Sequence, residues 1–319
     1  MTSLPLAERL VALLVAHPAG AADRVVRATL GGAAGEAAAT LRARGYDLRQ
    51  AGSHWRLGCA ARHFDPAAFE AARSGRWGSP CEVWEVAGST NDLARQGALG
   101  GAPEGALWLA ETQTAGRGRQ GRTWNCGAHA GILASWILRG MGPSGPPAGL
   151  LPLAVGLGLC EGLRAVTQLA LRTKWPNDIY LEDAKVAGIL VEARPGRAGF
   201  AVVGLGLNVE REPERDVAAG RPTGAVGTRD GRAGRREALL AAALAEAERR
   251  VEEWRSGRHA SLLAAYRESD LTQGRAVRVA CGKRMLAGRG VGIGASGCLL
   301  LEGPDGRIRE LAAGEVHLS

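Results

Sequence analysis

The segment AGRGRQGRTW (residues 115–124) contains the Gly-x-Gly-x-x-Gly spacing that is typical of dinucleotide-binding loops. A dinucleotide-binding fold also needs a strand before the loop, a helix after it and an acidic residue about 20 positions further on. Residues 105–115 have the pattern of a strand, but residues 131–140 (GILASWILRG) have the pattern of another strand, and no acidic residue lies near position 140. The sequence therefore argues against a Rossmann fold and requires another interpretation of this loop.

Three arginines alternate with the glycines of the loop: Arg117, Arg119 and Arg122. Glycines allow backbone N–H groups to approach an anion closely, and arginines bind phosphate or carboxylate through paired hydrogen bonds. Trp124 adds a flat face for a purine ring or for packing. We interpret the segment as an anion-binding loop, and a solvated surface loop is the alternative.

A second motif is indicated by the choice of basic residues. Of 40 basic residues only three are lysine, namely Lys174, Lys185 and Lys283. Lysine in such an arginine-rich chain indicates a need for a compact ammonium group that arginine cannot replace. In TKWPNDIYLEDAKVAGILVE (173–192), Lys174, Asn177 and Asp178 cluster at a Trp-Pro turn, and Lys185 lies on the following strand. Asp178 is a candidate for binding a metal–nucleotide complex or acting as a base, and a capped hairpin with an ordinary salt bridge is the alternative.

Two shorter motifs contain neutral polar residues. In AGSTND (87–92), Ser89, Thr90 and Asn91 offer donors and acceptors suited to an uncharged polar group such as an amide or a ureido group. The alternative is that they cap the following helix. In GLGLNVE (204–210), Asn208 ends a buried strand and is either a site residue or a turn residue.

The order of the predicted elements favours an α+β protein with three domains. Residues 1–60 have three short helices and a hairpin, the layout of a winged helix-turn-helix domain. Residues 61–271 combine strands with a long apolar helix, and residues 272–319 have the short strands and glycine turns of a small β-barrel. Residues 211–235, rich in Gly and Arg, are predicted to form a mobile loop.

Several features indicate a cytoplasmic protein. The six cysteines have no C-x-x-C spacing, and the N-terminus lacks the basic region of a signal peptide. No run of eighteen apolar residues occurs, so we predict no membrane span and no membrane partner. The net charge of +8 suggests polyanionic partners such as phosphates, nucleotides or nucleic acid.

The motifs AGRGRQGRTW, KWPNDIYLEDAKVAGILVE, GSTND and GLGLN occur in the order and at the spacing of one family. The chain resembles the bifunctional biotin–protein ligases, whose bacterial members double as biotin operon repressors. The resemblance covers essentially the whole chain, although the N-terminal match is by layout more than by residues. It implies a winged helix, a central mixed-sheet ligase domain of class II synthetase-like fold, and a C-terminal SH3-like barrel.

The resemblance implies a two-step reaction with ATP, biotin and Mg²⁺. The biotin carboxylate attacks the α-phosphorus of ATP, pyrophosphate leaves, and a lysine of a biotin carboxyl carrier protein then attacks biotinyl-5′-AMP. The expected catalytic residues are Lys185 at the biotin carboxylate, Arg119, which holds the reactive adenylate, and Asp178. Asp178 has two candidate roles, as a ligand of Mg²⁺ or as a proton acceptor.

The resemblance also assigns the remaining site residues. The biotin site is expected to contain Ser89, Thr90, Asn91, Gln113, Gly116, Arg117, Gly118, Arg119, Lys185 and Gly188. The nucleotide site is expected to contain Arg119, Arg122, Trp124, Lys174, Asn177, Asn208 and part of 211–235. Gln120 departs from the family, which often has a basic residue there.

DNA is an expected but weakly supported partner. Residues 1–78 carry ten Arg/Lys and six Asp/Glu, and Arg42, Arg44, Arg49 and Arg56 are candidate phosphate contacts. The presumed recognition helix, AAGEAAATLRARG (33–45), offers mainly Ala, Gly and Glu36 where base recognition favours Arg, Lys, Asn, Gln or Ser. Specific repression and a degenerate or purely structural domain both remain open.

Two other functions remain as alternatives: a lipoate–protein ligase of related fold, and a DNA-binding regulator without ligase activity. The GRGRQGR loop and KWPND argue against the first, and the presence of Lys185, Arg119 and Asp178 argues against the second. The family resemblance leaves a monomer or a ligand-linked homodimer, the latter formed by edge-strand pairing in the central domain.

Overall fold

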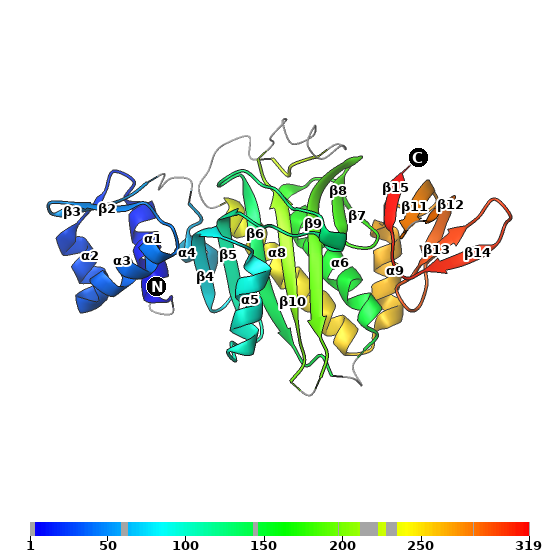
Figure 1. Ribbon diagram of the computed structural model, residues 1–319, viewed down its shortest axis with the longest axis horizontal. Helices are drawn as coiled ribbons and strands as arrows, with labels where there is room; N and C mark the ends of the chain where they lie inside the picture. Colours follow the sequence, from blue (N-terminus) through cyan, green and yellow to red (C-terminus); the bar gives the residue numbers. More distant parts are fainter. Residues whose placement is uncertain are drawn as a thin grey trace.

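The computed structural model describes residues 4–58, 63–142, 146–196, 198–210, 223–227, 235–282 and 284–318. Most of the loop predicted at 211–235 lies outside the described residues, and so does Lys283. In the described part, sheets of three, seven and five strands follow one another along the chain (Figure 1). The predicted α+β class is therefore confirmed.

The N-terminal unit packs three helices against a small antiparallel sheet of order β1-β3-β2. Its elements are α1 (Leu6–Ala16), β1 (Ala21–Ala22), α2 (Asp23–Leu30), η1 (Gly31–Ala33), α3 (Ala34–Ala43), β2 (Leu48–Ala51) and β3 (His54–Leu57). Leu10 and Leu14, one helical turn apart on α1, are completely buried with Leu41 of α3. This burial of one helical face explains why the short helices are stable together.

The central sheet has the order β4-β5-β6-β10-β9-β8-β7. Its strands are β4 (Cys81–Ala87), β5 (Leu107–Gln113), β6 (Gly131–Arg139), β7 (Leu171–Lys174), β8 (Asp178–Leu181), β9 (Ala184–Arg194) and β10 (Phe200–Asn208). The pair β4 and β5 is parallel, whereas all other neighbouring strands are antiparallel. The central sheet is therefore mixed, as the family resemblance implies.

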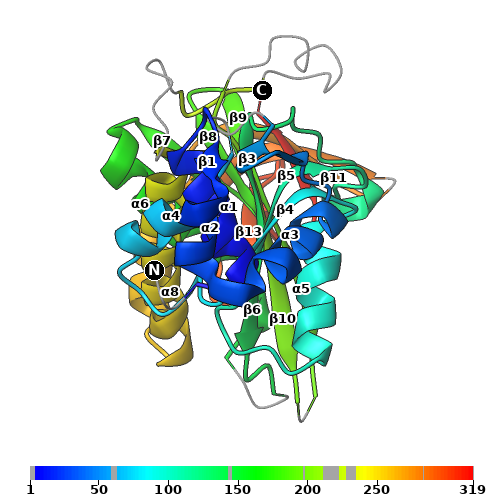
Figure 2. The same ribbon diagram turned by 90° about the vertical axis from the view of Figure 1, so that its left-hand side faces the viewer.

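Helices cover the two faces of this sheet unequally (Figures 1 and 2). One face carries α5 (Thr90–Leu99), and the other carries α6 (Leu151–Thr167, preceded by η4, Ala148–Leu150) and α8 (Arg235–Arg255). The side chains of β10 alternate accordingly, with Val203 and Leu205 in the core on the α6 side. Gly204 and Gly206 face the α5 side, where the absence of a Cβ leaves room for the Asn91 side chain and the Trp124 indole.

The helix Ala148–Thr167 is long and apolar enough to cross a membrane by length and composition alone. In this protein 67% of its most apolar window is buried. A Cβ added at Gly162 would lie 2.3 Å from the carbonyl oxygen of Ala242 in α8, so the two helices pack with their backbones in close contact. Burial between the sheet and α8 accounts for the apolar character of this helix.

The C-terminal unit is a five-stranded antiparallel sheet of order β14-β13-β12-β11-β15. Its strands are β11 (Ala276–Cys281), β12 (Arg284–Ile293), β13 (Leu299–Glu302), β14 (Ile308–Leu311) and β15 (Glu315–Leu318), preceded by α9 (His259–Ser269). It lies at the opposite end of the central sheet from the N-terminal unit (Figure 1). The indole N–H of Trp175 donates to the carbonyl of Gly297 at 2.9 Å and joins this unit to the β7–β8 turn.

The junction between the N-terminal and central units depends on Arg44. Its guanidinium donates to Glu8 and to the carbonyl of Val83, and its own carbonyl accepts from the backbone of Glu85 and Val86 on edge strand β4. The side chain is only 12% exposed. Arg44 therefore serves the junction, which corrects the expectation that it contacts DNA phosphates. α4 (Pro66–Ala72) packs beside it against α1 and α8.

Candidate active site

One open cavity lies on the α5 side of the sheet beyond the N-terminus of α5. Its volume is about 930 Å³, which includes solvent space at its opening. The cavity brings together fourteen of the sixteen residues predicted for the site. These are Ser89, Thr90, Asn91, Gln113, Arg117, Gly118, Arg119, Arg122, Trp124, Lys174, Asn177, Asp178, Lys185 and Gly188. Four motifs that are far apart in the sequence thus share one surface.

Two predicted residues, Gly116 and Asn208, do not line this cavity. Gly116 supports the anion-binding loop, since a Cβ there would lie 2.3 Å from the carbonyl oxygen of Trp124. Asn208 holds a neighbouring segment, because its Nδ2 donates to the carbonyl of Gly224 at 3.0 Å. Both residues therefore position other groups in this structure, and their direct ligand contact stays a prediction.

A chain of neutral polar groups forms one wall of the cavity. The backbone N–H and hydroxyl of Thr90 donate to Gln113 Oε1 at 2.7 and 3.1 Å, and Thr90 Oγ1 lies 2.7 Å from Ser135 Oγ. Ser135 donates to Asn91 Oδ1 at 2.6 Å, and Asn91 Nδ2 donates to Glu192 at 2.6 Å. Thr90, Asn91 and Ser135 are buried, so these bonds fix their orientation.

Ser89 occupies the N-cap position of α5, but its side chain makes no capping hydrogen bond. The capping interpretation of this motif is therefore not supported for Ser89. Ser135 was not predicted as a site residue. Its only sequence signal is a single hydroxyl in the apolar strand GILASWILR, on the face opposite the main core.

The anion-binding loop turns back on itself instead of entering a long helix. Arg117 and Thr123 pair as an antiparallel bridge, and the N–H of Gly118 donates to the carbonyl of Arg122 at 2.7 Å. At the tip, the short 3-10 turn η3 (Arg119–Gly121) contains Gln120 and Gly121 at φ 57° and 73°. The expectation that no dinucleotide-type helix follows the glycines is confirmed.

The three arginines of the loop have different partners. Arg117 donates two hydrogen bonds to Asp92, at 2.6 and 2.9 Å, and this bond to Arg117 holds the pKa of Asp92 below its usual value. Arg122 pairs with Glu315 of the C-terminal unit. Arg119 donates to Asn177 Oδ1 at 3.1 Å, and burial lowers its pKa. Arg119 is therefore the loop arginine whose charge lies deepest against the turn of KWPND.

Lys185 and Asp178 form the charged centre of the cavity. Lys185 Nζ lies 2.6 Å from Asp178 Oδ1, and both side chains are largely buried. Lys174 instead donates to the hydroxyl of Tyr180 at 3.0 Å and lies 4.6 Å from the centre of its ring. The salt bridge considered for this hairpin thus joins Asp178 to Lys185, because the bulge between Ile179 and Tyr180 shifts the register of β8 against β9.

Trp124 lies over two glycines that face each other across β9 and β10. Gly188 and Gly206 are direct partners, and added Cβ atoms would lie 2.9 and 2.3 Å from the indole. Lys185 Nζ is 5.4 Å from the centre of the Trp124 ring. The indole Nε1 is buried and has no hydrogen-bond partner in the described part of the chain. The glycine pair therefore makes room for one aromatic ring between the loop and the sheet.

We expect Gly206→Ala to displace the Trp124 indole without unfolding the sheet, because β10 is extended and alanine adopts that backbone. Misplacement of a site residue by about 1 Å typically costs up to about a hundredfold. Affinity for biotin and ATP, the ligands expected from the sequence, should fall by roughly ten- to hundredfold in equilibrium binding measurements.

Gly142→Ala is the matched control, since a Cβ there would meet nothing within 4 Å. Both variants should unfold at nearly the same temperature as the parent protein. Unchanged ligand affinity in Gly206→Ala would show that the indole position does not matter.

The C-terminal unit contributes Gly314, Glu315 and Val316 to the cavity wall. These residues were not predicted, because the sequence of this unit has no recognisable ligand motif. The ion pair from Glu315 to Arg122 crosses from β15 to the anion-binding loop. It shows that the third unit closes one side of the site.

Comparison with known proteins identifies relatives that cover about three quarters of the chain. The model of the biotin/lipoate A/B protein ligase family matches residues 83–208. The biotin–[acetyl-CoA-carboxylase] ligase of Mycobacterium tuberculosis is 37% identical over 253 residues, covering 74% of this chain and 88% of that protein. The bifunctional ligase/repressor BirA of Escherichia coli is 34% identical over 248 residues, covering 76% of this chain and 74% of that protein.

Solved structures show the same fold. The biotin protein ligase of Aquifex aeolicus in complex with biotin and ATP superimposes with a TM-score of 0.62 at 25% identity. The superposition covers 76% of this chain and 99% of that chain.

Proposed function

The chain belongs to the family of biotin protein ligases, and we propose from this premise that its cavity carries out both steps of biotin attachment. The biotin carboxylate attacks the α-phosphorus of ATP, an O–P bond forms, and pyrophosphate leaves with the bond electrons. The amine of a carrier lysine then attacks the carbonyl carbon of the adenylate, a C–N bond forms, the amine loses a proton, and AMP leaves.

The observation that carries this proposal is the convergence of one buried cation, Lys185, and one half-buried cation, Arg119, on one cavity. A carboxylate and a triphosphate repel each other, so their reaction needs fixed positive charge at the point of contact. Lys185 lines the cavity over Trp124, and Arg119 lies on the facing loop. We assign Lys185 to the biotin carboxylate and the bridging phosphate oxygen, and Arg119 to retention of the adenylate.

The neutral polar wall suits the ureido ring of biotin. A ureido group presents both N–H donors and a carbonyl acceptor, and Ser89, Thr90 and Asn91 offer complementary groups. The dithiolane ring of lipoate lacks them, and its binding would leave these buried groups without ligand partners. Biotin should therefore be accepted strongly in preference to lipoate.

The nucleotide is assigned to the side of the cavity formed by KWPND and the C-terminal unit. Lys174, Asn177, Arg122 and Trp124 line that side, with Trp124 presenting an aromatic face to adenine. Asn208 would act through the segment it anchors, in which the N–H of Gly224 donates to the carbonyl of Lys185 at 2.8 Å.

Asp178 is the residue that fits Mg²⁺. It and Glu315 are the carboxylates among the described residues of the cavity. Each is paired with a cation, Asp178 with Lys185 and Glu315 with Arg122, and of the two only Asp178 is a predicted site residue. Mg²⁺ takes one or two carboxylate oxygens and completes its shell with phosphates and water, so Asp178 would supply one ligand of an ATP-bound ion. When bound, the ion would neutralise phosphate charge. The alternative role, as proton acceptor for the carrier lysine, predicts that Asp178→Asn impairs transfer more than adenylate formation.

The direct test of the function is incubation of the protein with biotin, ATP, Mg²⁺ and a carrier domain, followed by an avidin blot. Labelling that needs all four components is expected. A protein that labels no carrier domain would contradict the proposal and favour a regulator without ligase activity.

We propose that the N-terminal unit is a winged helix-turn-helix domain with weak base recognition. The bifunctional names of relatives support a regulatory role, and its three helices and three-stranded sheet fit the winged layout. However, the exposed face of α3 carries Gly35, Glu36, Ala39 and Arg42, which offers one basic side chain and one acid. A mobility shift with the organism's own biotin-operon region should decide. Binding that is indifferent to sequence would leave repression unsupported.

We also propose a division into three domains, at residues 1–60, 61–271 and 272–319, of which the last is SH3-like. We further propose a cytoplasmic location. The oligomeric state is proposed as monomer or ligand-linked dimer. One edge of the central sheet is already contacted by Arg44, and the other, β7, pairs with Asp270 at Thr173. Edge-strand dimerisation would therefore use the part of β4 or β7 that these contacts leave uncovered. Analytical sedimentation with and without biotin and ATP measures the oligomeric state and tests this proposal.

A further inference from the structure

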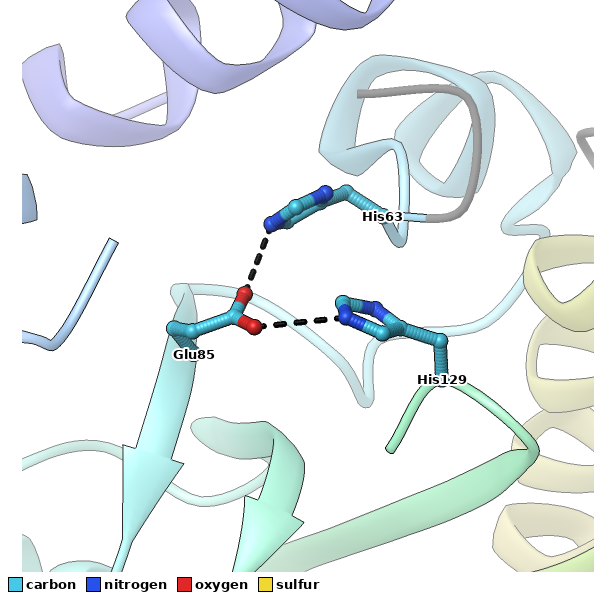
Figure 3. Close-up of side chains that lie close together, drawn as sticks. All are labelled: His63, Glu85 and His129. Atoms are coloured by element: carbon cyan, nitrogen blue, oxygen red, sulfur yellow. Dashed lines mark ion pairs between the residues drawn. The ribbon is translucent and has the colours of Figure 1, made fainter. Parts of the chain in front are cut away.

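A second cluster of titratable groups lies away from the ligase cavity, where the N-terminal and central units meet. It consists of His63, Glu85 and His129, whose candidate ligand atoms all lie within 4.8 Å of one another. His63 follows the N-terminal sheet, Glu85 lies on β4, and His129 precedes β6 (Figure 3). We propose that these three residues bind a divalent transition-metal ion of the zinc class.

The two imidazoles converge on one carboxylate. His63 Nε2 lies 2.6 Å from Glu85 Oε2, and His129 Nε2 lies 3.3 Å from Glu85 Oε1 (Figure 3). Ligands of a tetrahedral zinc ion are about 2.0–2.2 Å from the metal and about 3.4 Å apart, so small side-chain shifts admit the ion. Two histidines and a glutamate form a set that zinc prefers over Mg²⁺, and water would fill the open position.

The contact between Glu85 and His63 is short but does not have the geometry of a hydrogen bond. Glu85 Oε2 is buried and makes no hydrogen bond of acceptable geometry, despite the short distance to His63. A short but misaligned contact is expected where lone pairs converge on a common point rather than share a proton. The carboxylate therefore points into the cluster without a geometrically satisfied partner.

A further carboxylate lies behind His129. Glu111 Oε2 is 3.4 Å from His129 Nδ1, and Glu111 is itself completely buried and paired with Arg236. Metal-binding histidines commonly direct the second ring nitrogen at a carboxylate, which fixes the ring and leaves Nε2 for the metal. Here Glu111 lies on the Nδ1 side of His129 and leaves Nε2 facing Glu85, while His129 has the left-handed backbone conformation, φ 61°.

Aromatic packing shields the cluster on the side of the N-terminal unit. The Tyr46 ring stacks on His63 with centroids 5.3 Å apart, and the rings of His63 and His129 are 4.8 Å apart. A bound ion would thus join the segment that follows the N-terminal unit to β4 and to the segment that runs from Trp124 of the ligase cavity to His129. The N-terminal unit would contact the ion's ligands through the Tyr46 ring, which stacks on His63.

The competing arrangement is a metal-free ion-pair network. Close contacts with the Glu111 and Glu85 carboxylates raise the pKa of His129 to about 9 in that state, so a metal ion must displace a proton. A measurement of Zn²⁺ binding therefore distinguishes a metal site from an ion-pair network. This measurement does not depend on ligase activity.

The test uses the full-length protein, freed of any affinity tag, stripped with a chelator and titrated with Zn²⁺ by calorimetry at pH 8. One equivalent is expected to bind, to raise the unfolding temperature, and to be insensitive to excess Mg²⁺. The double variant His63→Gln/His129→Gln should lose this binding. His54→Gln is the control, because His54 is an exposed histidine outside the cluster.

A single variant, Glu85→Gln, keeps the shape of the side chain and should weaken zinc binding at least about tenfold even if the double variant folds poorly. Parent protein that binds no stoichiometric Zn²⁺ would overturn the proposal. Zinc that the folded double variant retains would assign the metal to other residues, such as the cysteines, and would also overturn it.

Discussion

Replacing Lys185 by arginine should reduce the rate of adenylate formation at least about tenfold, which corresponds to about 1.4 kcal/mol of transition-state stabilisation. The Lys185 ammonium is confined between Asp178, 2.6 Å away, and the Trp124 ring, 5.4 Å away. The guanidinium of arginine is planar and spreads its charge over three nitrogens, so it cannot place one compact charge in that space. Pyrophosphate exchange in the absence of carrier protein measures this step alone.

Arg309→Lys serves as a control for this prediction, since Arg309 pairs with Asp305 in an exposed ion pair on the C-terminal sheet. It should leave the exchange rate unchanged. The unfolding temperature of Lys185→Arg must also be measured, because Asp178 loses its partner. A folded Lys185→Arg protein with near-normal exchange would show that Lys185 has no special catalytic role.

The second large effect is expected at Arg119. Arg119→Ala should release biotinyl-5′-AMP about ten- to a hundredfold faster, because a hydrogen bond to a charged group contributes about 1.5–3 kcal/mol. Arg119 is the loop arginine that reaches Asn177 at the turn of KWPND. Preformed labelled adenylate, chased with unlabelled biotin and ATP, gives the dissociation rate directly.

Arg117→Ala is the matched variant in the same loop. The Arg117 guanidinium is already engaged by both oxygens of Asp92, so its removal should change the release rate less. If Arg117→Ala releases the adenylate faster than Arg119→Ala, the assignment of the retaining arginine is wrong.

The motifs predicted most of the cavity because each one carries its own chemistry. The glycine and arginine alternation of 115–124 indicated an anion-binding loop, and the rare lysines indicated the positions that need an ammonium group. Fourteen of the sixteen residues that the motifs and the family resemblance predicted for the site line one cavity. The α+β class was also predictable, because strand and helix periodicity is a local property of the sequence.

Other site features depend on which residues meet across the fold. Ser135 supports Thr90 and Asn91 of the polar wall only because α5 packs over β6, and Gly206 admits Trp124 only because it faces Gly188 across the strands. Glu315 reaches Arg122 only because the C-terminal sheet packs beside the loop. None of these pairings has a signal in one stretch of sequence.

The junction illustrates the same limit. The count of basic residues suggested Arg44 as a contact for DNA, yet its guanidinium is paired with Glu8 inside the molecule. The cluster of His63, Glu85 and His129 was not predictable from the sequence, because the three residues are far apart along the chain and follow no metal-binding spacing.

The sequence by itself determined the elements, the motifs and the type of anion chemistry, because periodicity, glycine content and the choice of lysine over arginine are local. Only the tertiary structure decided which charge pairs with which. Asp178 pairs with Lys185 rather than Lys174 because a single extra residue in β9, Val186, shifts the register against β8 and brings Lys185 to the face of Asp178. Long-range packing determines these partners. A charged side chain that the sequence marks as a candidate ligand contact can bind a ligand only if the fold has not paired it with another group.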